Sequence, residues 1–110
     1  MYMSHATIKN EGGRILKEIS GFEWDKGNKG KNLIKHKIID EECEEVFFDQ
    51  NKKILTDIIH SGTEERHILI GKTKKQRLIF LVFTIRKNKI RIISARDLNN
   101  KEYKLYEEKN

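Results

Sequence analysis

The stretch from Arg77 to Leu98 constrains the fold most, because it predicts two neighbouring strands of one sheet. Its first part, Leu78 to Phe83, is an unbroken run of six apolar residues rich in branched and aromatic side chains. A run of this length between polar segments is typical of a strand covered on both faces. After the polar segment Arg86 to Lys89, apolar and polar residues alternate with the period of a half-buried strand. We therefore predict a hairpin whose first strand is central in the sheet.

The second strand of this hairpin is expected to place Ile90, Ile92 and Ser94 on one face, opposite Arg91, Ile93 and Ala95. If Asn88 and Lys89 form the loop, Arg86 faces Arg91 across the ladder. Like charges in that position are destabilising. Three remedies stay open: a carboxylate from elsewhere in the chain, splaying of the side chains into solvent, or an external anion.

The length and composition of the chain favour one small domain. A chain of 110 residues has room for one core. Charged and hydrophobic residues each make up 36% of it, so we expect a compact core and one-sided helices. The single cysteine excludes an internal disulfide, and neither a signal-peptide pattern nor an apolar run of about 20 residues occurs. We therefore expect a soluble cytoplasmic protein without a membrane contact.

Charge is unevenly distributed along the chain. Between Arg66 and Arg96 there are ten Lys and Arg residues and no Asp or Glu, whereas Asp40 to Asp49 holds six acidic residues and no basic one. With a net charge of +6, an acid-free basic sheet face is how phosphate backbones are bound. The alternative is a solvated sheet surface whose lysines protect its edges.

The segment before the acidic stretch is expected to begin with an N-terminal extension, residues 1–21. Phe22 to Asp25 then predicts a short edge strand in which Trp24 packs rather than stacks on a base. Asp25 is a candidate N-cap for a helix that runs to about His36. Leu33 and Ile34 would anchor this helix, and its exposed side would carry lysines.

Two more helices are predicted. Cys43, Val46 and Phe47 form one apolar stripe of a helix over Asp40 to Phe48, so Cys43 is expected in the core. Its acidic first turn suits the helix dipole. At the other end of the chain, Asn99 and Glu102 form a capping box for a last helix, on which Tyr103 and Tyr106 share a face.

Further strands are predicted over Ile54 to Ile59 and Arg66 to Lys72, with turns at residues 60–63 and 74–76. The resulting fold class is α+β: an antiparallel four- to five-stranded meander sheet with two N-terminal helices and one C-terminal helix.

Motifs for cofactors and metals are missing. The sequence has no Gly-rich phosphate loop, HExxH or paired CxxC, and His60, Glu64 and His67 span a turn and a strand without a cysteine. We predict no cofactor and no metal site. RNA cleavage needs no metal, because the 2′-hydroxyl is the nucleophile and the protein need only hold the phosphate, stabilise charge and move protons.

A set of short motifs occurs in order along the chain. They are Phe22-Glu23-Trp24-Asp25, Asn32-Leu33, Lys35-His36, Val46-Phe47, Glu65-Arg66, Ile70-Gly71, Arg77-Leu78, Arg91-Ile92-Ile93-Ser94-Ala95-Arg96 and Tyr106-Glu107. In this order they resemble the BrnT toxin family of bacterial type II toxin–antitoxin systems. The resemblance covers Phe22 to Glu108, and residues 22–110 are interpreted as a BrnT-like toxin domain.

This resemblance implies a RelE-like ribonuclease that cuts RNA, inhibits translation and is neutralised by a cognate BrnA-type antitoxin. Operator DNA would be bound only through the toxin–antitoxin complex. Carried over by position, the implied catalytic residues are His36, Glu65, Arg86 and Arg91. The implied RNA-binding residues are Lys35, Arg66, Ser94, Arg96 and Tyr106.

Four of these residues also have a purely structural interpretation. His36 would pair with carbonyls at a helix end, Ser94 would make a strand-end hydrogen bond, Arg96 would pair with the last helix, and Tyr106 would pack in the core. The alternative function is a non-catalytic basic module that binds nucleic acid or only pairs with an antitoxin.

Overall fold

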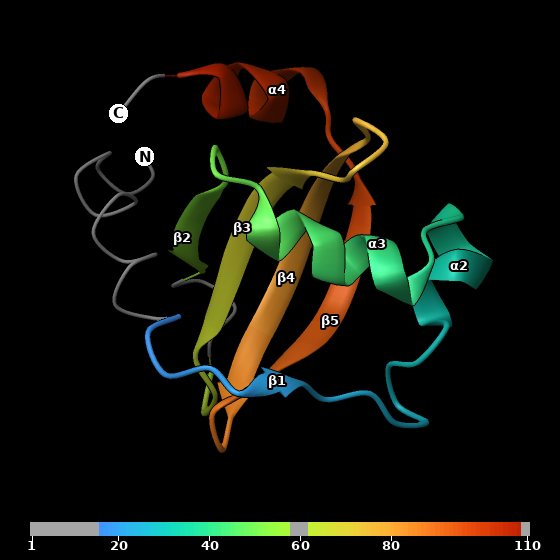
Figure 1. Ribbon diagram of the computed structural model, residues 1–110, viewed down its shortest axis with the longest axis vertical. Coiled ribbons are helices and arrows are strands. Elements are labelled where there is room, and N and C mark those ends of the chain that lie inside the picture. The colour runs from blue at the N-terminus through green and yellow to red at the C-terminus, as the bar shows by residue number, and fades with distance from the viewer. Residues whose placement is uncertain (1–15, 58–61, 109–110) are drawn as a thin grey trace.

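The computed structural model describes residues 16–57 and 62–108 (Figure 1). The elements in chain order are β1 (Gly21–Phe22), α2 (Lys31–His36), α3 (Asp40–Glu45), the 3-10 helix η1 (Val46–Phe48), β2 (Lys53–Asp57), β3 (Arg66–Lys72), β4 (Leu78–Arg86), β5 (Lys89–Asp97) and α4 (Asn100–Glu107). One sheet has the strand order β1-β5-β4-β3-β2. Its strands pair antiparallel except for β1, which runs parallel to β5. The predicted α+β class is confirmed.

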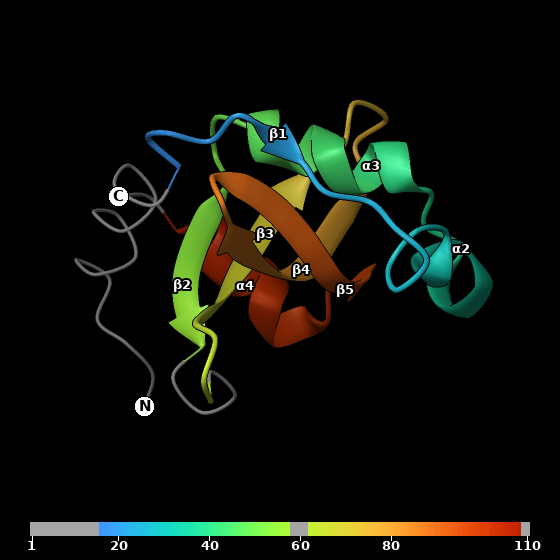
Figure 2. The ribbon, with the colours of Figure 1, turned by 90° about the horizontal axis from the view of Figure 1, so that it is seen from below.

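Strand β4 is central and covered on both faces, as its apolar run predicts. Ile79, Leu81 and Phe83 are fully buried in the larger core, which α3 covers. The intervening side chains Phe80 and Val82 point to the other face, where a smaller core forms under α4. Figure 2 shows α3 on one side of the sheet and α4 on the other.

The apolar stripe predicted over Asp40 to Phe48 is also confirmed, although this segment divides into α3 and the 3-10 helix η1. Cys43, Val46 and Phe47 are buried in the larger core, and the Phe47 ring meets Phe22 and Phe83 edge-on at centroid distances of 5.3 and 5.0 Å. Leu16 and Ile19, which belong to the predicted N-terminal extension, pack against this core as well.

The predicted loop of the β4–β5 hairpin is wrong by one residue. Lys87 and Asn88 form the turn with φ values of 50° and 66°, so Arg86 pairs with Lys89 and not with Arg91. This register places Ile85 opposite Ile90, so two apolar side chains share the core face and Lys87 stays in the loop. Turns with both φ values positive match the twist of the adjoining strands.

The alternation predicted for β5 is interrupted by a bulge. Val82 pairs with Ser94 and Phe83 with Ile92, so Ile93 is an extra residue without a partner on β4. Beyond a bulge of this kind, each side chain points to the opposite face of the sheet from the one that strict alternation would give. Ala95 therefore joins Ile92 in the larger core, and Ser94 turns to the α4 side, against our expectation.

The first predicted helix is much shorter than expected. Asp25 begins a turn, its side chain accepting a hydrogen bond from the Gly27 N–H, and helix α2 starts only at Lys31. The predicted anchors Leu33 and Ile34 are exposed, and the buried residue of the helix is Asn32. Two glycines in the segment disfavour a helix before Lys31.

Helix α4 has the predicted capping box. The Asn99 side chain accepts from the Glu102 N–H at 2.9 Å, and the Glu102 side chain accepts from the Asn99 N–H at 3.0 Å. Tyr106 packs in the smaller core, whereas Tyr103 is exposed, so the two do not share a packed face.

Strand β3 has its predicted bounds. Strand β2 begins one residue earlier than predicted, and the rest of that predicted strand, with His60 and Ser61 of the next turn, lies outside the described residues.

Candidate nucleic-acid interface

The bulge in β5 gathers polar residues on the α4 side of the sheet. Arg91, Ser94 and Arg96 lie opposite Thr84, Val82 and Phe80 of β4, respectively. Because side chains alternate along a strand, Arg86 of β4 and Arg66 of β3 point to the same side. We call this surface the arginine face: Arg66, Arg86, Arg91, Ser94 and Arg96.

Arg86 binds the carboxylate of Glu64, which was not predicted to lie at this face. Its Nε donates to Glu64 at 2.6 Å and its Nη2 at 3.1 Å, and this pair lowers the pKa of the Glu64 carboxyl. The Arg86 side chain is 48% exposed, so solvent and ligands can reach its guanidinium. No sequence signal identified Glu64, because the pair joins residues 22 positions apart.

Arg91 of β5 forms hydrogen bonds with the segment of the chain that precedes α2. Its guanidinium donates to Glu23 at 3.1 Å and to both oxygens of Asp25 at 2.9 and 3.0 Å, which lowers the pKa of Asp25. Only 15% of the side chain is exposed, and a Cβ added to Gly27 would lie 2.7 Å from Arg91 Nη2. Arg91 is therefore less accessible to a phosphate than Arg86.

Arg96 lies over the Phe80 ring, with its guanidinium carbon 4.0 Å from the ring centroid. Its Nη1 and Nη2 donate to the two oxygens of Glu102, both at 2.8 Å. Partial burial raises the pKa of Glu102, but the hydrogen bonds from Arg96 and the Asn99 N–H lower it overall. This is the ion pair with the last helix that the structural interpretation predicts. The Arg96 side chain is nevertheless 40% exposed.

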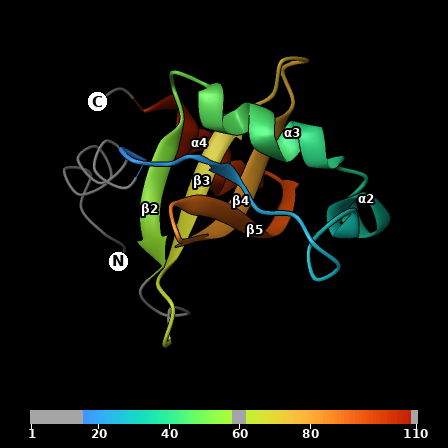
Figure 3. The same ribbon diagram turned by 60° about the horizontal axis from the view of Figure 1, so that its bottom comes forward.

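Helix α2 and the turn before it cover the outer edge of β5 beyond β1. Asn28 Nδ2 donates to the Ile92 carbonyl at 3.2 Å, and Lys31 Nζ donates to the Ile93 carbonyl at 3.1 Å. The Ala95 N–H donates to Asn32 Oδ1 at 3.0 Å. Both asparagines are buried, and they hydrogen-bond backbone groups of β5 that would otherwise lack partners. Figure 3 shows α2 beyond β5 at this edge.

His36 and Lys35 are exposed at the end of α2. The Arg77 guanidinium binds the His36 carbonyl at 3.1 Å and both oxygens of Asp97 at 2.8 and 3.3 Å. The backbone of His36 therefore lies close to Asp97, the last residue of β5. We call this region the α2 end of the arginine face.

Charge differs between the two ends of the arginine face. At the hairpin end, Arg86 and Arg91 are matched by three carboxylates, those of Glu23, Asp25 and Glu64. The α2 segment has five exposed lysines and no acidic residue between positions 26 and 39: Lys26, Lys29, Lys31, Lys35 and Lys37. In the acid-free basic stretch noted in the sequence, Arg77, Arg86, Arg91 and Arg96 are thus paired with carboxylates in the fold, whereas the segment of residues 26–39 keeps an excess of positive charge.

The predicted catalytic residues are not brought together at one point. Arg91 and Asp97 are six residues apart on β5, roughly 20 Å along an extended strand, so Arg86 and His36 lie at opposite ends of the face. Glu65 lies 3.8 Å from His67 Nε2, and the His67 ring packs beside Phe83 on the α3 side.

Tyr106 also lies away from the exposed part of the face. Its side chain is buried in the smaller core, and its hydroxyl donates to Asp49 Oδ2 at 2.7 Å. The structural interpretation of Tyr106 is confirmed.

Comparison with known families agrees with the resemblance carried by the motifs. Residues 24–102 match the family model described as the ribonuclease toxin BrnT of type II toxin–antitoxin systems. The chain belongs to the BrnT toxin family. Its substrate is therefore RNA, and its partner is a cognate antitoxin. No curated protein matches the sequence.

In the described part of this BrnT toxin, no three His, Cys, Asp or Glu side chains are grouped as metal ligands. Among the same residues, no helix combines the length and apolar character that a bilayer crossing requires.

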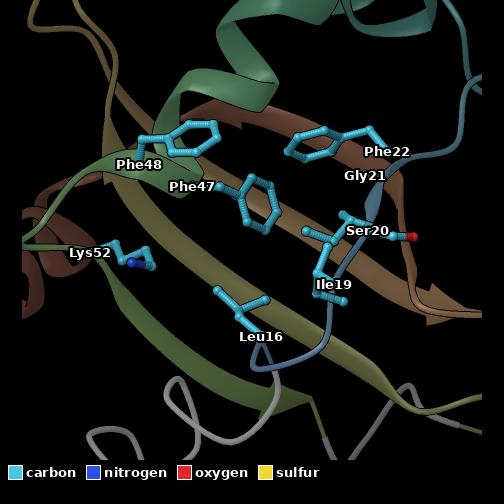
Figure 4. Close-up of a pocket in the computed structure, with 9 residues that line it drawn as sticks. Leu16, Ile19, Ser20, Gly21, Phe22, Phe47, Phe48 and Lys52 are labelled. Atoms are coloured by element: carbon cyan, nitrogen blue, oxygen red, sulfur yellow. The ribbon is translucent and has the colours of Figure 1, made fainter.

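This BrnT toxin also has an apolar groove on the α3 side of the sheet, with a volume of about 490 Å³. Figure 4 shows the side chains of Ile19, Phe22 and Phe47 converging there, with Phe48 and Leu16 beside them. The groove lies across the sheet from the arginine face, so it does not belong to the candidate interface.

Proposed function

We propose that this BrnT toxin cuts RNA without a metal ion at the α2 end of the arginine face and thereby inhibits translation. The observation that carries this proposal is the β5 bulge, which sets Arg91, Ser94 and Arg96 in one row beside the lysine-bearing helix α2. Bulges are common next to active sites, where they redirect side chains.

The RNA backbone would follow β5. Arg96 and Arg86 are the exposed arginines of the face, and Arg66 lies on the same side. Lys35 would add a phosphate contact from α2, and Ser94 a hydroxyl contact. Arg91, which is mostly buried against Glu23 and Asp25, would hold the strand and its edge in place.

In the proposed reaction the 2′-hydroxyl oxygen attacks the adjacent phosphorus. A bond from this oxygen to phosphorus forms, the bond to the 5′ oxygen breaks, and the products are a 2′,3′-cyclic phosphate and a 5′-hydroxyl. Arg96 would stabilise the additional negative charge of the transition state. Because the nucleophile belongs to the RNA, the step requires no metal-bound water.

We assign the proton transfer to His36. Histidine exchanges protons near neutral pH, and His36 is exposed beside the end of β5 that carries Arg96. Glu65 points to the opposite face, and Glu64 has a lowered pKa because Arg86 binds it, which makes it a weak base. His36 would accept the 2′-hydroxyl proton, and water would protonate the leaving 5′ oxygen.

We further propose that a BrnA-type antitoxin neutralises the toxin in the cytoplasm. The antitoxin in this complex would bind operator DNA and repress the shared operon. Expression of the toxin alone should arrest growth, and co-expression of the neighbouring reading frame should restore it. Normal growth with soluble, folded toxin would contradict the toxic activity.

The decisive experiment is digestion of RNA by the purified toxin in the presence and absence of a chelator. Cleavage should persist in chelator, and a substrate with deoxyribose at the cleaved position should resist. Arg96→Ala should lower the rate about 100-fold, which corresponds to losing one charge-stabilising donor.

Two variants control this experiment. Glu102→Gln removes the charge that pairs with Arg96 but keeps the guanidinium, so it should retain most activity. Lys75→Ala removes one exposed positive charge at the β3–β4 turn and should cut like the parent. Loss of cleavage in chelator, or an Arg96→Ala rate equal to the parent rate, would overturn the mechanism.

A non-catalytic basic module is the second candidate, and the pairing of Arg86, Arg91 and Arg96 with carboxylates favours it. Salt dependence tests the RNA contacts themselves. Three phosphate contacts, from Arg86, Arg96 and Lys35, predict a slope of about −2 for log affinity against log salt, and Arg86→Ala should reduce it by about 0.7. Binding with this slope but without any cleavage would favour the module.

A further inference from the structure

The corner between α2 and α3 exposes apolar side chains that the fold leaves uncovered. Ile34 is 87% exposed, Leu33 48% and Ile39 43%. All three lie within seven consecutive residues. Helix α2 has only six residues and is held to the sheet by the buried Asn32, so these side chains are not needed to dock it. Grouped apolar exposure of this kind marks interaction surfaces.

Positive charge surrounds these apolar side chains. Lys31, Lys35 and Lys37 are interleaved with them along the chain, and all three are exposed. Within residues 16–57 and 62–108, none of the three forms an ion pair with a carboxylate. We call the surface of Lys31, Leu33, Ile34, Lys35, Lys37 and Ile39 the α2 corner.

The chemistry of the α2 corner selects among possible occupants. A second copy would bring lysine against lysine, which is unfavourable for a chain with a net charge of +6. RNA would satisfy the lysines but would leave the exposed isoleucines without apolar contacts. A protein segment that combines carboxylates with apolar side chains matches both features.

We propose that the cognate antitoxin docks an acidic segment with apolar side chains on the α2 corner. The inference rests on the membership of the chain in a toxin–antitoxin family, and it deepens the proposed function by naming a surface for the partner. A segment bound there would cover Lys35 and the approach to His36. Neutralisation would then follow from exclusion of RNA at the α2 end of the arginine face.

The apolar groove on the α3 side is the competing surface. Its most exposed side chain is Phe48, at 77%, and its lining contains one charged residue, Lys52. It thus offers a partner little charge complementarity. A partner bound there would lie across the sheet from the arginine face and would leave the proposed RNA path open.

The test compares two exposed apolar residues that face different surfaces. The full-length variants Ile34→Asp and Phe48→Asp are purified, and their affinity for the purified product of the neighbouring reading frame is measured by calorimetry. Ile34→Asp should weaken binding about 30-fold or more, as expected for a residue near the centre of an interface. Phe48→Asp should change the dissociation constant by less than about 3-fold, which is small for an interface residue. Melting temperatures show whether both variants fold.

RNA cleavage by the free variants separates this inference from the proposed function. Free Ile34→Asp should cut RNA at close to the parent rate but resist inhibition by the antitoxin. Parent-like antitoxin binding by Ile34→Asp would overturn the inference, as would loss of binding in Phe48→Asp instead. Reduced RNA affinity of Ile34→Asp with unchanged antitoxin affinity would also overturn it, because Ile34 would then contribute to RNA binding and not to antitoxin binding. If no variant or parent cuts RNA, the affinity comparison still decides the docking site.

Discussion

At the scale of single residues, charge is matched over long sequence distances. The hydrogen bonds of Arg91 to Glu23 and Asp25 span 68 and 66 positions, and those of Arg77 to Asp97 span 20. Helix α3 makes a similar long-range contact, in which Glu44 accepts a hydrogen bond from the Trp24 indole at 2.7 Å. Arg86 and Arg91 do not face each other, and of the three remedies left open each of them has a carboxylate from elsewhere in the chain.

Tyr106→Phe tests the structural role of that tyrosine. Burial and the hydrogen bond to Asp49 raise the pKa of Tyr106 and keep its hydroxyl protonated. Removing the hydroxyl should lower the free energy of unfolding by about 1 kcal/mol, the net value of one hydrogen bond, and leave RNA cleavage unchanged. Urea unfolding and a cleavage assay measure the two effects. A stable variant that no longer cuts RNA would instead support the implied role of Tyr106 in binding RNA.

Cys43 should be chemically inert in the folded protein. Burial, with the negative charges of Asp40, Glu42 and Glu44, raises the pKa of its thiol to about 12. A thiol in this state carries almost no thiolate at pH 8. A thiol reagent should therefore label native protein slowly and urea-unfolded protein at once, as followed by absorbance. Rapid labelling of the native protein would mean that α3 does not pack as described.

At the scale of elements, the edge of β5 depends on asparagines rather than on another strand. Asn32→Ala removes the acceptor of the Ala95 N–H and should lower the free energy of unfolding by about 2 kcal/mol, because a buried donor is left unpaired. Hydrogen exchange at Ala95 should accelerate as well. Both can be measured on the purified protein, by urea unfolding and by exchange.

Lys29→Ala is the matched control for this edge, since Lys29 is exposed in the same segment. It should leave both measurements unchanged. Equal stability of Asn32→Ala and the control would show that water replaces the amide at no cost.

At the scale of the whole molecule, arginine–carboxylate pairs should govern stability in acid. Asp25, Glu64, Asp97 and Glu102 have pKa values lowered from ordinary values of 3.8 for Asp and 4.5 for Glu. The unfolded chain then binds more protons than the folded chain as the pH falls through these values. The pairs therefore stabilise the fold above about pH 4.5 and lose this contribution progressively below it.

The urea midpoint should accordingly decrease between pH 5 and pH 3. The double variant Glu64→Gln and Glu102→Gln should show a shallower decrease, because two of the titrating carboxylates are gone. A parent midpoint that does not change with pH would show that these pairs contribute little in solution.

The sequence by itself determined the features that depend on local physics. The apolar run of β4 identified the central strand, the spacing of Cys43, Val46 and Phe47 gave the buried stripe of α3, and Asn99 with Glu102 gave the start of α4. Each follows from the period of one element or from a cap a few residues long. Arg86, Arg91, Ser94 and Arg96 were named as site residues by the family resemblance, position by position.

Only the tertiary structure decided how these residues are arranged. The one-residue bulge at Ile93 moves Ser94 to the face of Arg91, and its position depends on pairing with β4. The segment from Asn28 to Asn32 binds the edge of β5 beyond β1, a role that no local pattern reveals. Glu64, rather than Glu65, meets Arg86 because side chains alternate between the two faces of the sheet, so one residue decides which face a carboxylate reaches.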